Sequence, residues 1–175
     1  MRPSLAFDAV AAGSQFRDTI AIRTRAPAAA LLRAARDVTL SDMKLAWLLG
    51  EIRYLPSRLF GRQRAYPRNE PFLSRLMRDG TLILSETPRE IIFGSAGRLH
   101  QIAGQTPITF ANREEFDAFD DGEYEKLFMS LRVEPADASD DRWLVLEHAT
   151  KALSPGAGRK FSWYHHPALP EFRRS

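Results

Sequence analysis

Two histidines and three carboxylates on predicted strands are the side chains of this sequence best suited to acid–base chemistry. His100 and His148 each lie in a segment expected to be a strand, where Glu86, Glu90 or Glu147 could approach across a sheet. A histidine beside a carboxylate can exchange protons near neutral pH, and burial tunes the pKa of both groups. A histidine satisfied by one hydrogen bond is the commoner case, so we expect a structural role. Glu90, Glu147 and His148 remain the candidate catalytic residues.

Glu147 raises a separate question about charge. If it shares a buried face with Trp143 and Val145, its carboxylate needs a cationic partner. Arg89 or Arg132 could supply one.

Several other chemistries lack the residues they need. The chain has no cysteine, which excludes disulfides, thiolate nucleophiles and cysteine-ligated metals. His165 and His166 are adjacent, and on a helix they would point about 100° apart, which does not suit a metal site. Gly94 and Gly97 have the spacing of a phosphate-binding loop, but no lysine–serine pair or helix follows them. We therefore expect no metal and no cofactor.

Arginines gather in the segment Arg58–Arg68, which also contains Arg62 and Arg64. Charged runs usually form a solvated surface, but such a segment could instead be an interaction module for an anionic membrane surface, RNA or an acidic protein. The net charge is only +3, with acidic and basic residues intermixed, so we expect no nucleic-acid partner.

The length and composition predict one domain. A chain of 175 residues with 44% hydrophobic content can build a single core. Residues 1–15 show no periodicity and are expected to form a loose N-terminal arm, so the domain spans 16–175. No stretch is long and apolar enough to cross a bilayer, and none resembles an apolar leader, so we expect a cytoplasmic protein without integral membrane association.

The first third of the chain predicts one strand followed by helices. Residues 18–24 alternate, with Ile20 and Ile22 on the buried face of a strand. A short helix follows Pro27, a second helix runs from Thr39 or Ser41 to Pro56, and a third runs from 69 to 79.

The rest of the chain changes to a period of two and predicts an antiparallel sheet. Four short strands are expected at 81–86, 90–94, 98–103 and 107–111, and a helix capped by Asn112 and Glu115 follows them. Two long strands come next, joined by the loop 135–141. One strand carries Leu127, Met129, Leu131 and Val133 on a single face, and the other carries Trp143, Val145, Glu147 and Ala149 on a single face. A final helix is expected over 158–166.

This α+β order of elements resembles the helix-grip fold of the START/Bet v 1-like superfamily, also called SRPBCC, and most closely an uncharacterised bacterial branch of it. The resemblance covers residues 16–166 and rests on three stretches: 39–61, with Thr39-Leu40-Ser41-Asp42-Met43 and Leu49-Gly50-Glu51-Ile52-Arg53-Tyr54-Leu55-Pro56; Arg89-Glu90-Ile91-Ile92-Phe93-Gly94-Ser95-Ala96-Gly97-Arg98; and Glu114-Glu115-Phe116-Asp117-Ala118-Phe119. It implies a curved antiparallel sheet wrapped around a C-terminal helix.

Such a fold implies an internal apolar cavity that binds a hydrophobic small molecule, such as a lipid, polyketide or isoprenoid. The alternative is an enzyme of the polyketide cyclase or dehydratase type that uses a histidine–carboxylate pair in the same cavity. Either form is expected to be a monomer or homodimer. The expected ligand contacts are large apolar side chains: Ile20, Ile22, Trp47, Phe93, Leu99, Phe110, Met129, Leu131, Trp143, Val145 and Phe161.

Overall fold

The computed structural model describes residues 4–39, 41–42, 69–101, 108–136 and 140–168, with side chains through residue 162. This part of the chain forms an α+β fold, as expected. Its elements are α1 (Leu5–Val10), β1 (Phe16–Thr24), α2 (Ala28–Asp37), α4 (Phe72–Arg78), β2 (Leu82–Thr87), β3 (Glu90–Gly97), α5 (Arg113–Ala118), β4 (Glu125–Pro135), β5 (Arg142–Ala152) and α6 (Pro155–Ala168).

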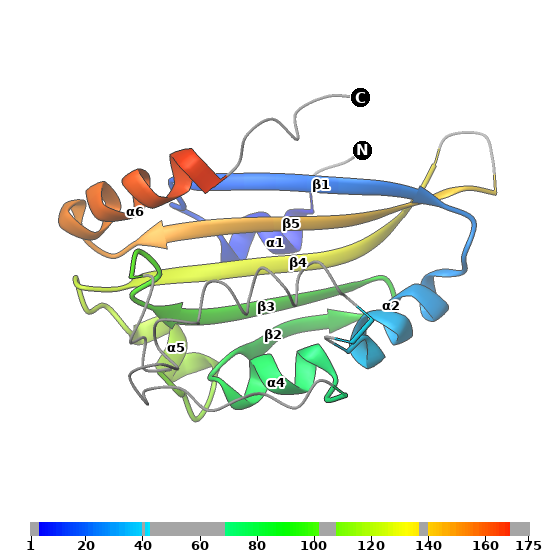
Figure 1. The fold of residues 1–175 in the computed structure, drawn as a ribbon, viewed down its shortest axis with the longest axis horizontal. Coiled ribbons are helices and arrows are strands. Elements are labelled where there is room, and N and C mark those ends of the chain that lie inside the picture. The colour runs from blue at the N-terminus through cyan, green and yellow to red at the C-terminus, as the bar shows by residue number, and fades with distance from the viewer. Residues whose placement is uncertain (1–3, 40, 43–68, 102–107, 137–139, 169–175) are drawn as a thin grey trace.

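The strands form one antiparallel sheet in the order β1-β5-β4-β3-β2. Figure 1 shows the sheet curving without closing, so β1 and β2 are its two edges. β4 is the central strand and β5 lies beside it. The two long strands pair as the predicted hairpin. The first strand therefore pairs with the last one, although most of the chain separates them.

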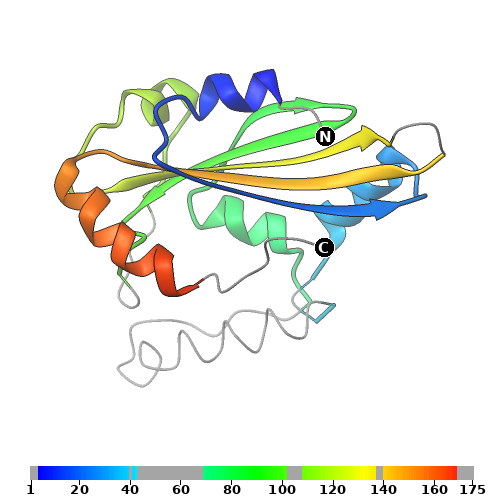
Figure 2. The same ribbon diagram turned by 90° about the horizontal axis from the view of Figure 1, so that it is seen from above.

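Helices cover both faces of the sheet (Figure 2). Because side chains alternate along a strand, each face takes every second residue. We call the face covered by α1 and α5 the α1 face; on β5 it carries Val145, Glu147 and Ala149. The opposite face, covered by α2, α4 and α6, is the α6 face; on β5 it carries Leu144, Leu146 and His148.

The larger apolar core lies on the α1 face. Phe7 of α1 and Phe116 of α5 are both fully buried there against Phe128 of β4. The Ser4 hydroxyl accepts a hydrogen bond from the Phe7 backbone N–H and caps α1. The segment predicted to be a loose arm therefore contains a helix, α1, that contributes to the core.

A smaller core on the α6 face packs α2 and α4 against β3 and β4. Leu32 of α2 is buried with Ile91, Phe93 and Val133. This helix covers β3 and β4 and leaves β1 open. The prediction that Ile20 and Ile22 are buried is consequently wrong: their side chains are 52% and 60% exposed.

The two short strands predicted after β3 are absent from the described residues. β3 ends at Gly97, residues 98–101 form a turn, and residues 108–111 are irregular; 102–107 lie outside the described residues. The helix expected from Asn112 is present as α5. The Asn112 side chain accepts from the Glu115 N–H, and the Glu115 carboxylate accepts from the Ala111 N–H, close to the predicted capping box.

Two short segments on the α6 face bring distant parts of the chain together. Thr39 and Pro71 form an antiparallel bridge, and the Phe72 N–H donates to the Val38 carbonyl at 2.8 Å. The helix predicted up to Pro56 falls mostly in residues that the structure does not describe. The final helix α6 begins at Pro155, three residues before the predicted start, and the Ser154 hydroxyl accepts a hydrogen bond from the Ala157 N–H.

Candidate functional site

An exposed apolar strip crosses β1 and β5 on the α6 face. Ile20 pairs directly with Leu146, and Ile22 pairs with Leu144. Leu146 in turn pairs with Leu131 of β4. Ile20, Ile22 and Leu146 are 52%, 60% and 40% exposed, whereas Leu131 and Leu144 are half-buried against the smaller core. We call these five residues the apolar strip.

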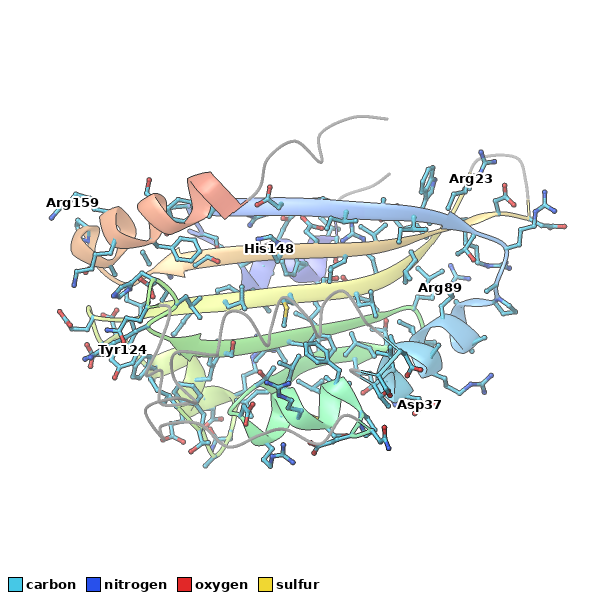
Figure 3. The ribbon with its side chains drawn as sticks, in the orientation of Figure 1. Arg23, Asp37, Arg89, Tyr124, His148 and Arg159 are labelled. Atoms are coloured by element: carbon cyan, nitrogen blue, oxygen red, sulfur yellow. The ribbon has the colours of Figure 1, made fainter. Side chains whose placement is uncertain are left out.

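A histidine–carboxylate pair adjoins one end of the apolar strip. His148 and Asp18 follow Leu146 and Ile20 in register, and His148 Nε2 lies 3.5 Å from Asp18 Oδ2. Both side chains are about one-third exposed, so solvent and ligands can reach them. Figure 3 shows His148 near the middle of the sheet. The pair has the composition needed for acid–base chemistry, with Asp18 in place of the carboxylates that the sequence suggested.

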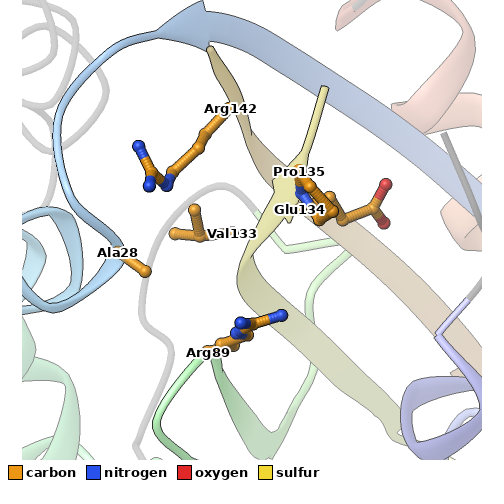
Figure 4. Close-up of a pocket in the computed structure, with 6 residues that line it drawn as sticks. All are labelled: Ala28, Arg89, Val133, Glu134, Pro135 and Arg142. Carbon is orange, nitrogen blue, oxygen red and sulfur yellow. The ribbon is translucent and has the colours of Figure 1, made fainter. Parts of the chain in front are cut away.

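A pocket adjoins the other end of the strip, at the far end of the sheet (Figure 4). Its volume is about 210 Å³. Val133 contributes to its wall and pairs directly with Leu144, so the pocket is continuous with the apolar strip. The lining consists of Ala28, Arg89, Val133, Glu134, Pro135 and Arg142.

A network of charges lies on the α1 face. Arg132 Nη1 donates to Glu147 Oε2 at 2.5 Å, and its Nε donates to Glu134 Oε1 at 2.7 Å. Burial alone would lower the pKa of Arg132, but the hydrogen bonds and charges of the two carboxylates outweigh it and hold this pKa above its ordinary value. Of the two arginines that the sequence offers as partners of Glu147, Arg132 pairs with it, whereas Arg89 lines the pocket.

The candidate catalytic residues do not converge. Glu90 accepts a hydrogen bond from the Ser130 hydroxyl at 2.6 Å and lies on the α1 face with Glu147. His148 projects from the opposite face because it follows Glu147 directly in β5. A site combining His148 with either glutamate is therefore ruled out by the geometry of the sheet.

His100 also has a partner that the sequence did not suggest. Its Nδ1 lies 2.8 Å from Glu125 Oε1, and the Leu99 N–H donates to Glu125 Oε2 at 2.8 Å. Glu125 is fully buried at the start of β4, so it anchors the turn that follows β3. Its two hydrogen bonds indicate a structural role.

Two further charged groups have perturbed pKa values. Burial lowers the pKa of Lys126, whose ammonium donates to the Asp117 carbonyl and lies 5.0 Å from the centre of the Phe116 ring. A hydrogen bond from Arg25, helped by Arg23, lowers the pKa of Asp141. The Thr39 hydroxyl and N–H lower the pKa of Asp42 in the same way.

The predicted ligand contacts are divided between the two faces, so they cannot line one cavity. Those on or above the α6 face are Ile20, Ile22, Phe93, Met129, Leu131 and Phe161. Those on the α1 face are Phe110, Trp143 and Val145. Leu99 lies in the turn after β3, while Trp47 and the arginine segment Arg58–Arg68 lie outside the described residues.

Asp18, Arg142 and Glu125 are the residues of interest that sequence reasoning missed. The register of β1 against β5 places Asp18 opposite His148, and no local pattern encodes that register. Arg142 had one available signal: it precedes Leu144 and Leu146 at a spacing of two, which places it on their face.

Comparisons with known proteins add no relatives. No protein-family model, curated protein or solved structure matches the chain.

Within the described ranges, the histidines and acidic residues form no group of three that could hold a metal ion. No helix in those ranges has the length and apolar character needed to cross a bilayer.

Proposed function

We propose that this protein binds a hydrophobic small molecule on the α6 face of its sheet. The observation that carries the proposal is the exposure of Ile20, Ile22 and Leu146 side by side on paired strands. Single exposed apolar residues are ordinary, but contiguous ones mark interaction sites. An apolar ligand would remove this surface from water, which contributes about 25 cal/mol per Å² buried.

The proposed binding mode agrees with a helix-grip fold. In support, a curved open sheet carries α6 beside β1 and β5, and the Phe161 ring of α6 lies 4.9 Å from that of Phe16 in β1. We propose on this basis, and on the sequence resemblance, that the chain is a member of the SRPBCC superfamily. The helices α1 and α5 on the other face would then be additions to the common arrangement.

Nile red, a neutral dye whose fluorescence rises in apolar surroundings, provides a direct test of binding. We expect saturable binding to the wild-type protein, weakened at least about tenfold in the double variant Ile20→Thr/Ile22→Thr, because each isoleucine contributes on the order of 1 kcal/mol of apolar contact. Threonine keeps the β-branched shape that suits a strand.

The matched control is Leu5→Ser, which removes an exposed apolar side chain from α1 on the opposite face. Its dye affinity should equal that of the wild type. Equal affinities in the control and the double variant would refute binding at the apolar strip, and no saturable binding at all would refute the proposed function.

A second candidate function is acid–base catalysis on the bound molecule, as in polyketide cyclases and dehydratases. The observation that favours it is the contact between His148 and Asp18 beside the apolar strip. Turnover of a polyketide mimic that His148→Gln abolishes, with Nile red affinity unchanged, would support it. Binding without turnover in the wild type would leave only the binding function.

A further inference from the structure

We propose that the ligand is a long-chain carboxylic acid, with its carboxylate in the pocket lined by Arg89 and Arg142 and its hydrocarbon chain on the apolar strip. This inference rests on the proposed function and specifies the class of molecule bound. The pocket of Figure 4 supplies the polar end of the site.

The first argument is the pairing of arginines. Most of the arginines that the structure describes form a salt bridge. Four of the described arginines form none: Arg33, Arg89, Arg142 and Arg159. Two of these four line the same pocket. Arg142 Nη1 donates to the Asp140 carbonyl, which leaves its other guanidinium donors available to a ligand. A guanidinium presents a planar set of donors that matches a carboxylate.

The second argument is the shape of the pocket. A volume of about 210 Å³ is smaller than the roughly 300–1,000 Å³ of sites that enclose a whole drug-sized ligand, so it suits only the polar end of one. Ala28, the first residue of α2, forms part of the wall, and the positive end of the α2 dipole adds to the attraction for an anion.

Glu134 also lines the pocket, but its carboxylate is hydrogen-bonded to Arg132. Figure 4 shows this carboxylate directed away from Arg142 and Ala28. Because this charge is already paired, it does not oppose an anion in the pocket, and a planar carboxylate matches the planar donor set of a guanidinium. We therefore commit to a carboxylate.

The third argument is continuity between the pocket and the strip. Arg142, Leu144 and Leu146 lie on the same face of β5, and Ile22 and Ile20 flank the two leucines on β1. From Arg142 to Leu146 the strand rises roughly 13 Å, at about 3.3 Å per residue. An extended hydrocarbon chain that starts at the pocket can therefore lie along the apolar strip.

Displacement of Nile red by two ligands of equal chain length tests the inference. We compare dodecanoate and 1-dodecanol at pH 8, where the acid is ionised, below the concentrations at which either aggregates. The wild type should bind dodecanoate about tenfold or more tightly than 1-dodecanol, because hydrogen bonds to charged groups are stronger than those to neutral ones.

Arg89→Gln and Arg142→Gln should each lower the affinity for dodecanoate by about tenfold and leave that for 1-dodecanol unchanged. The matched control is Arg33→Gln, the same change at an exposed α2 arginine outside the pocket. Equal binding of acid and alcohol by the wild type, or a preference for the acid that survives both pocket substitutions, overturns the inference while leaving the proposed function standing. Failure of both molecules and of the dye to bind overturns the proposed function itself.

Discussion

The fully buried Glu125 and the half-buried His100 form a pair in which His100 Nδ1 lies 2.8 Å from Glu125 Oε1. The other carboxylate oxygen accepts the Leu99 N–H, so Glu125 satisfies two donors of one turn. A carboxylate with no exposed surface is stable only when its hydrogen-bonding capacity is used. This pair fixes the turn after β3 against the first residue of β4.

Replacing Glu125 by alanine should destabilise the fold. The substitution leaves the Leu99 N–H and the His100 ring without their acceptor, and each unsatisfied buried group costs about 1–3 kcal/mol. Urea denaturation should show a loss of at least about 2 kcal/mol in the free energy of unfolding. Glu123→Ala, at a side chain that is 61% exposed, is the control and should change it by less than about 0.5 kcal/mol. Equal losses in the two variants would contradict a structural role for the pair.

Arg132→Met should destabilise the protein by about 3–5 kcal/mol, because it leaves Glu134 and Glu147 largely buried without their cation. Adding Glu147→Gln should recover part of the loss, since one of the unpaired charges is then removed. Arg159→Met on the exposed side of α6 is the control. Additive effects of the Arg132 and Glu147 substitutions would count against their pairing.

Gly80→Ala should destabilise the fold more strongly than Gly13→Ala. Both glycines have a positive φ, 95° and 78°, which costs an alanine roughly 1–2 kcal/mol. A Cβ at Gly80 would also collide with the backbone oxygen of Ile108, whereas one at Gly13 would meet only the end of the Lys151 side chain at 3.7 Å. Thermal denaturation of the two variants therefore separates the cost of the φ angle from the cost of the collision. Equal losses of stability in the two variants would contradict the close approach at Gly80.

The stability of the protein should fall in acid partly through Asp141. Its pKa is lower in the folded protein than the ordinary value of 3.8, so its contribution is complete above that pH and is lost as the pH falls through the folded pKa. Chemical denaturation at pH 6 and pH 3 should show a smaller difference between the two pH values for Asp141→Asn than for the wild type. An unchanged difference would contradict its pairing with Arg23 and Arg25.

Much of the sheet could be predicted from the sequence because local periodicity determines strands. The period of two placed β1, β2, β3 and the β4–β5 hairpin, and it assigned Leu131 and Trp143 to consistent faces of their own strands. The cap at Asn112 was also predictable, since a capping residue and its partner lie within one turn. Charge alone predicted an arginine partner for Glu147 but left Arg89 and Arg132 as alternatives, and the register of β4 against β5 selects Arg132.

Relationships between strands could not be predicted in this way. Val145 and Leu131 are both apolar and alternate correctly, yet they lie on opposite faces because the register pairs Leu131 with Leu146. Ile20 was expected inside because it alternates, but β1 is an edge strand that no described helix covers at that position. Contacts such as that between Asp18 and His148 depend on distant pairing, which a local pattern does not encode.

The bridge between Thr39 and Pro71 affects how the fold responds to changes in the length of the segment between them. Because Val38 and Phe72 are already hydrogen-bonded, the two ends of the intervening segment are held together by the framework itself. The entropic cost of closing such an excursion grows only slowly with its length. A designed change in the length of the stretch between these anchors should therefore add little to the entropic cost of closing it.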